Sequence, residues 1–200
     1  MKLLKLFLLS LCLISATLAG WAEEPDHADH EELRQLLTKV QGAMNEQKYS
    51  EMLPYFQDKC CVTLINQEAI RKPSEFEAYF KGWIGEGQYV KSLKMTLTAD
   101  DLTEFHGTGA DRYGVVCGTG TENYDLKDGR HLDLKTRWTA TVTKDSKGKW
   151  RILTLHLGAN FYNNPIVSEL QGSVKTYGIG GIAVGFLIGF AICWVVRKPK

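Results

Sequence analysis

Two residues of this sequence have a type and a setting that suit acid–base chemistry. His156 is the only histidine in a segment whose apolar residues alternate as in a core β-strand, and imidazole exchanges protons near neutral pH. The alternation places one set of residues on the buried face: Leu153, Leu155, Leu157 and Phe161. It therefore turns His156 outward, toward solvent or a partner. Asp101 follows an expected strand and is the second catalytic candidate, although adjacent aspartates are more common in solvated turns.

Other chemical motifs are scarce. His27 and His30 lie three residues apart among acidic residues and could hold a metal weakly, but a short linker is a poor metal site, so we expect both to be solvated. The sequence has no glycine-rich phosphate loop, nucleophile elbow or zinc signature. We therefore expect no metal and no cofactor. A formal net charge of +1 gives no basic field for binding nucleic acid.

The cysteines leave their redox state open. Cys60, Cys61, Cys117 and Cys193 follow the N-terminal apolar segment, and none has the C-x-x-C spacing of a redox or zinc motif. Either Cys60 or Cys61 could bridge to Cys117 in an oxidising compartment. The alternative is that these three are small buried apolar residues.

Hydrophobic periodicity predicts the elements that would position these residues. Residues 31–44 have the apolar spacing of an amphipathic helix, for which Asp29 is the expected N-cap. A short helix over residues 50–55, a strand over residues 60–65 and a helix opened by Pro73 follow. The aromatic stripe of this last helix is expected in the core.

After these helices the period changes to two, which predicts strands. Residues 113–124 form a long strand, expected to bulge at Gly118 and Gly120. Turn sequences at 127–130 and 145–148 predict hairpins. Helices first and hairpins afterwards predict an α+β fold, in which a curved antiparallel sheet packs on the N-terminal helices.

Both ends of the chain carry apolar segments. Residues 1–22 combine a basic start, an apolar run and small residues, which predicts a signal peptide cleaved after Ala19 or Ala22. A retained membrane helix is the alternative, although the run is shorter than the roughly 20 residues that a span needs. Residues 177–196 contain no charge and precede the basic tail 197–200, so they predict a transmembrane helix with a cytoplasmic C-terminus.

These segments together predict a single-pass membrane protein. A linker over residues 23–30 and a globular domain over residues 31–170 would lie outside the cytoplasm, on the periplasmic side of the inner membrane in a Gram-negative bacterium. Gly181, Gly185 and Gly189 recur every four residues, which would let two such helices pack closely. We therefore expect a homodimer.

The order of elements resembles the nuclear transport factor 2-like superfamily and, within it, the SnoaL-like and ketosteroid-isomerase-like branch. The resemblance covers about residues 31–165. Besides the first helix, it is carried by 48–53 (KYSEML), 128–130 (DGR), 137–140 (RWTA), 148–152 (GKWRI) and 158–165 (GANFYNNP). The resemblance implies a cone-shaped curved sheet that often forms dimers.

The resemblance also implies a pocket on the helix-covered face of the sheet. The apolar faces predict that Tyr55, Phe80, Trp138 and Leu155 line this pocket, with few acids or bases. Such a lining favours a membrane-anchored module that binds a small apolar ligand or assembles with a partner. The alternative is a small-molecule isomerase, dehydratase or hydrolase, because isomerase relatives use a carboxylate base and a tyrosine–aspartate acid pair in an apolar cavity.

Overall fold

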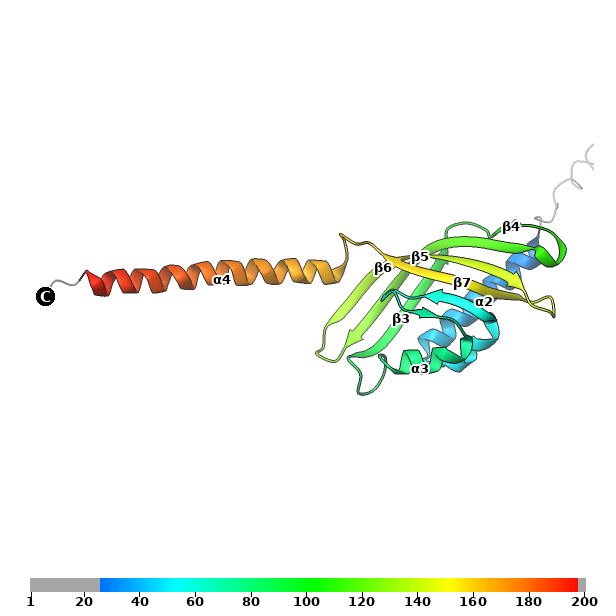
Figure 1. Cartoon of the computed structure of the whole chain (residues 1–200), viewed down its shortest axis with the longest axis horizontal. Helices are drawn as coiled ribbons and strands as arrows, with labels where there is room; N and C mark the ends of the chain where they lie inside the picture. Colours follow the sequence, from blue (N-terminus) through cyan, green and yellow to red (C-terminus); the bar gives the residue numbers. More distant parts are fainter. Residues whose placement is uncertain (1–25, 198–200) are drawn as a thin grey trace, which may run out of the picture.

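The computed structural model describes residues 26–197 and shows an α+β domain followed by one long helix (Figure 1). The expected signal peptide, residues 1–22, lies outside the described residues, as does most of the basic tail. The elements are α2 (His27–Asn45), η1 (Tyr49–Tyr55), β1 (Phe56–Thr63), β2 (Ala69–Ile70), η2 (Pro73–Glu75), α3 (Phe76–Lys81), β3 (Val90–Ala99), β4 (Glu104–His106), η3 (Gly109–Asp111), β5 (Tyr113–Leu126), β6 (His131–Lys144), β7 (Trp150–Ala159) and α4 (Pro165–Val196).

The strands form one curved, open sheet, which confirms the predicted fold class. Their order is β2-β1-β7-β6-β5-β3, and β4 pairs with β5 outside this path. Every pair is antiparallel except β1 and β7, which run parallel. The sheet differs from the predicted one at this pair, because the chain reaches β7 only after building the other strands and no hairpin joins β7 to β1.

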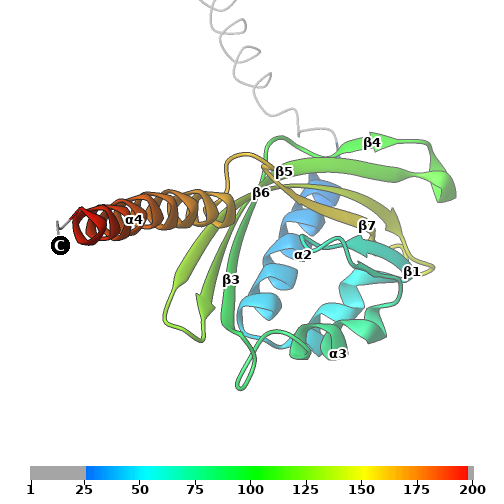
Figure 2. The ribbon, with the colours of Figure 1, turned by 60° about the vertical axis from the view of Figure 1, so that its left-hand side comes forward.

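Helix α2 lies across the concave face of the sheet, as Figure 2 shows. Its apolar residues are three and four positions apart, so they form one stripe that faces the strands. The stripe buries Leu33, Leu36, Val40 and Met44 in the main core. The helix and the sheet together therefore enclose the interior of the domain.

The aromatic stripe of the short helix α3 is in the core, as predicted. Phe76 and Phe80 are buried. Phe76 meets Phe56 of β1 edge-on, with ring centroids 4.6 Å apart, and Phe80 stacks on Tyr49 of η1 at 4.9 Å. These ring contacts fix α3 and η1 beneath β1.

The N-terminal end of α2 is held by the carboxylate of Asp29. The helix begins at His27, before the predicted cap, and Asp29 makes no capping hydrogen bond. Its carboxylate instead accepts hydrogen bonds of 2.9 Å from Arg112, Lys144 and the indole of Trp150. Burial disfavours the ionised form, but these hydrogen bonds and charges outweigh burial and lower the pKa of Asp29. The expected linker therefore includes the first turn of α2.

The other end of α2 is held by side-chain amides. Asn45 donates from Nδ2 to the carbonyl of Met95 (2.8 Å), and its Oδ1 accepts from the backbone N–H of Met95 (2.7 Å). Gln41 accepts from the backbone N–H of Leu97 at 2.7 Å. Because β3 ends the path of the sheet, these amides pair with backbone groups that another strand would otherwise bind.

Gly118 and Gly120 do not form the predicted bulges. Strand β5 pairs with β3 and β6 without a shift of register across these positions. A Cβ at Gly118 would lie 2.4 Å from the ring of Trp138, and one at Gly120 would lie 2.4 Å from the Thr136 hydroxyl. Both glycines instead make room for side chains of β6.

The chain leaves the sheet after β7 and continues into α4. Phe161 is 79% exposed, because it follows the last strand residue, and the prediction that it shares the buried face is wrong. Among the described residues, α4 is the one helix long and apolar enough to cross a membrane. It touches the domain where Arg130, in the β5–β6 turn, lies 2.5 Å from Glu169.

Gly181, Gly185 and Gly189 lie along α4, within the predicted span. A Cβ placed on any of them would meet nothing within 4 Å, so this face of the helix is open in the single chain. The close packing of two such helices, and the homodimer, stay predictions.

Replacing Asn45 with alanine should destabilise the domain by about 1–3 kcal/mol, because the backbone N–H and carbonyl of Met95 lose their partners. Urea unfolding of the full chain in micelles, followed by tryptophan fluorescence, measures the change. Lys39→Ala, at an exposed position of the same helix, should change stability by less than about 0.5 kcal/mol. Equal effects of the two substitutions would show that the edge contact does not stabilise the fold.

Candidate functional site

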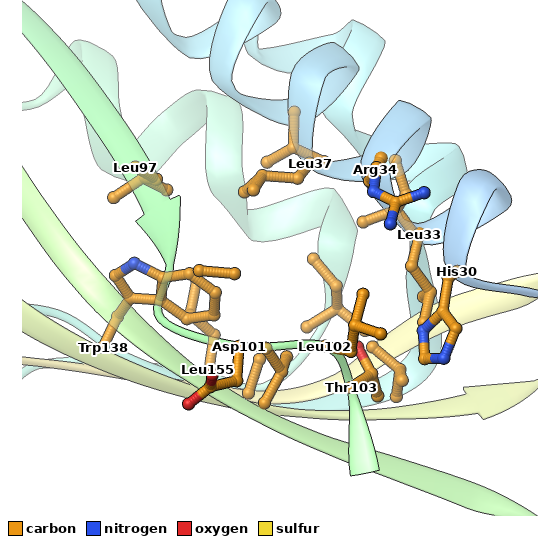
Figure 3. A pocket seen from close by; sticks show the side chains of 17 residues that line it. His30, Leu33, Arg34, Leu37, Leu97, Asp101, Leu102, Thr103, Trp138 and Leu155 are labelled. Atoms are coloured by element: carbon orange, nitrogen blue, oxygen red, sulfur yellow. The ribbon is translucent and has the colours of Figure 1, made fainter. Parts of the chain in front are cut away.

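A cavity of about 130 Å³ lies between the N-terminal half of α2 and the concave face of the sheet (Figure 3). Helix α2 forms one wall, strands β3, β5, β6 and β7 contribute to the other, and the link between β3 and β4 adds its edge. Most lining side chains are apolar, among them Leu33, Leu37, Leu97, Trp138, Ala140 and Leu155. This lining is typical of a site for a small apolar ligand.

Trp138 is the largest side chain of the cavity wall. Its indole N–H donates to the carbonyl of Thr119 at 3.0 Å, and its ring covers the backbone at Gly118. The only polar atom of the ring is therefore satisfied, and the rest is apolar surface. Ala140 and Leu155, which are paired across β6 and β7, continue the same wall.

The structure separates the four residues that the sequence placed in one pocket. Trp138 and Leu155 lie on the cavity wall. Phe80 does not, because α3 packs it between Tyr49 and Phe76 in the core beneath β1. Tyr55, at the end of η1, packs partly buried against that same core.

Polar groups gather at one end of the cavity. His30 and Arg34 come from successive turns of α2, and Thr103 lies beside them (Figure 3). His30 is 7% exposed, and its ring lies 5.0 Å from that of Phe105. Neither ring nitrogen has a hydrogen-bond partner among residues 26–197. The expectation of a solvated His30 is wrong, because α2 starts before this residue and carries it to the cavity.

The two catalytic candidates from the sequence lie apart. Asp101 is in the β3–β4 link at the rim of the cavity, on the side away from His30 (Figure 3). His156 is opposite Thr139 on β7, exposed on the outer face of the sheet. The structure does not bring Asp101 and His156 into one site.

A second polar feature of the concave face is a buried carboxyl group. Glu122 of β5 is 2% exposed, and the hydroxyl of Tyr124 donates to its Oε2. Its Oε1 and the hydroxyl of Thr136 have no hydrogen-bond partner among the described residues. Burial raises the pKa of Glu122, opposed by the hydrogen bond from Tyr124. Burial also raises the pKa of Tyr124. Glu122 is outside the cavity lining.

The cysteines of the described part of the chain are free thiols. Cys60 and Cys61 are on β1 and Cys117 is on β5, with β7 and β6 between them. Three strand spacings separate β1 from β5 by about 14 Å. This is beyond the reach of a disulfide. Within residues 26–197, no group of three or more histidine, cysteine or acidic side chains is placed to hold a metal ion.

Neither His30 nor Glu122 was predicted to lie inside the domain, although the sequence carries signals for both. His30 precedes Leu33 and Leu37 by three and seven positions, the spacing of one helix face. Glu122 has the strand parity of Gly118 and Gly120, which face inward on β5. An earlier helix start and a β5 strand without bulges would have placed both residues inside.

Comparison with known structures supports the fold. No protein-family model and no curated protein matches the sequence. A nuclear transport factor 2-like superfamily protein from Salmonella enterica has a TM-score of 0.53 at 15% identity, covering 65% of this chain and 89% of that one. Hexachlorocyclohexane dehydrochlorinase LinA-type3 from Novosphingobium barchaimii has a TM-score of 0.54 at 12% identity, covering 67% and 88%. The chain therefore has the nuclear transport factor 2-like fold, as the sequence resemblance implied.

Replacing Glu122 with glutamine should stabilise the protein increasingly as the pH rises above the ordinary glutamate value of 4.5. A carboxyl whose pKa is raised on folding contributes stability that is complete below its unfolded pKa and is lost as the pH rises through its folded pKa. Glutamine keeps an acceptor for Tyr124 but does not ionise. The stability difference, from urea unfolding at several pH values, should grow by about 1.4 kcal/mol per unit until the folded pKa is reached. A difference independent of pH would contradict the burial argument.

Proposed function

We propose that this protein is a membrane-anchored module that binds a small apolar molecule outside the cytoplasm. The cavity under α2 carries this proposal, because its wall is apolar and hydrogen-bonding groups gather at one end. Ligand sites commonly combine such a lining with a few polar groups that fix orientation. A module that only assembles with a partner has no comparable use for the cavity.

The size of the cavity limits the ligand. An apolar protein cavity of about 150 Å³ accepts benzene. A volume of about 130 Å³ therefore suits a six-membered ring or a branched chain of similar size. A ligand of this size could extend polar atoms past the rim.

Binding is better supported than catalysis. An isomerase or dehydratase needs an acid or base that reaches the substrate. His30 lines the cavity and can exchange protons, but the carboxylates do not stand beside it: Asp101 is exposed at the other side of the rim, and the buried Glu122–Tyr124 pair lies outside the lining. The dehydrochlorinase of similar fold does not transfer its activity at 12% identity, because fold does not imply function.

The proposed membrane anchor is supported by α4 and the residues around it. Its C-terminal part has no charge from residue 177 to residue 196, while Arg197 begins a basic tail. Basic residues next to a span favour the cytoplasmic side. Together with the signal-like residues 1–22, this supports a domain on the outer side of the membrane.

Filling the cavity should abolish binding. Benzamide is a suitable water-soluble probe, and we expect it to bind the full chain in nanodiscs with a Kd of about 0.1–1 mM. Ala140→Leu places a larger side chain in the cavity and should remove this binding, measured by calorimetry against empty nanodiscs. Thr139→Leu, the neighbouring substitution on the outer face, is the matched control and should keep it. Unchanged binding to the Ala140→Leu protein would exclude the cavity as the site.

The topology can be tested with reporter fusions in a Gram-negative host. Alkaline phosphatase, which is active only in the periplasm, should be active when joined after Pro165. A fluorescent protein that matures only in the cytoplasm should glow when joined after Lys200 and stay dark after Pro165. The reverse pattern would contradict the proposed orientation.

A further inference from the structure

We infer that the ligand of the cavity is a small apolar carboxylate, such as a monocyclic aromatic acid or a branched aliphatic acid. Its apolar body would lie against Trp138, and its carboxylate would lie at His30 and Arg34. This inference rests on the proposed function and specifies its ligand class. It comes from the division of the cavity lining into an apolar end and an end with hydrogen-bond donors (Figure 3).

His30 and Arg34 suit the oxygen atoms of an anion. They are four residues apart on α2, so their side chains lie one turn apart on the same face. The guanidinium is always charged and presents paired N–H donors that match a carboxylate. The imidazole donates at least one N–H in either charge state.

His30 is placed to form a hydrogen bond with a ligand in the cavity. It is 7% exposed and lines the cavity, and its ring nitrogens have no partner among residues 26–197. These nitrogens therefore keep their hydrogen-bonding capacity, and an N–H of the ring can donate to a carboxylate oxygen that enters the cavity. Thr103 lies at the same end and offers a further hydroxyl.

The opposite end of the cavity is apolar below its rim, where the exposed carboxylate of Asp101 lies. Trp138 has its indole N–H already bonded to Thr119, and Leu97 and Leu155 have no polar side-chain atoms. A polar group placed there would lose its water without gaining a partner. The ligand therefore has one polar end, which rules against sugars and other polyols.

Nearby acidic groups do not neutralise the binding end. Glu31 Oε2 lies 3.3 Å from Arg34 Nη1, but both side chains are about half exposed, and such ion pairs contribute little. Glu31 does not line the cavity, so it competes with the ligand for Arg34 from outside. Asp101 lies at the other side of the rim (Figure 3).

Matched probes test the carboxylate directly. Benzoate and its neutral isostere benzamide should be titrated by calorimetry into the full chain in nanodiscs of uncharged lipid. We expect benzoate to bind about tenfold more tightly, and Arg34→Gln to remove most of that advantage while leaving benzamide binding nearly unchanged. Lys39→Gln removes the same charge from an exposed position of α2 outside the cavity lining and should change neither affinity.

Glu31→Gln provides a test with the opposite sign. It releases Arg34 and removes a nearby negative charge, so benzoate should bind more tightly and benzamide should not. Equal affinities of the two probes, or equal losses in Arg34→Gln, would overturn the carboxylate assignment and leave the proposed function standing. Failure of both probes to bind would instead refute the proposed function.

Discussion

The arrangement of the domain depends on how α2 is fastened across the curved sheet. At one end Asp29 accepts hydrogen bonds from Arg112, just before β5, and from side chains of β6 and β7. At the other end Asn45 and Gln41 complete the free edge of β3. The first attachment uses charge and the second uses neutral amides. Because the helix is held at both ends, its N-terminal half can lie over a space that its own side chains do not fill, and this space is the cavity.

The concave face of the sheet covers a filled aromatic core in one part and a cavity in the other. Beneath β1, the rings of Phe56, Phe76 and Phe80 fill the volume, and this part of the domain is solid core. Beneath the N-terminal half of α2, smaller aliphatic side chains leave space. Glu122 lies in neither the aromatic core nor the cavity wall. Its carboxyl group is buried beside the hydroxyl of Tyr124, and this burial disfavours the ionised form of the carboxyl. Packing therefore leaves the space for a ligand under the N-terminal half of α2 and fills the part of the concave face beneath β1.

More of the fold than of the candidate site could be predicted from the sequence. Periodicity and turn residues located the helices and the longer strands but not the short strands β2 and β4, because only the longer elements carry a clear local pattern. Faces were harder to assign, because a residue's side depends on where its element begins. Because α2 begins at His27, before the predicted cap Asp29, His30 lies on the helix face that lines the cavity. Similarly, Phe80 was correctly expected in the core, but only the tertiary position of α3 separates that core from the cavity.

Helix α4 has 32 residues, so at 1.5 Å per residue it is about 48 Å long, more than the roughly 30 Å of a bilayer's hydrocarbon core. With residues 177–196 in the bilayer, the roughly 12 residues before them form a stalk about 18 Å tall. Arg130 of the domain forms an ion pair with Glu169 of this stalk. The N-terminal half of α2 lies at the end of the domain away from α4 (Figure 1). In this arrangement the proposed binding site would face the water layer and meet dissolved molecules rather than lipid tails.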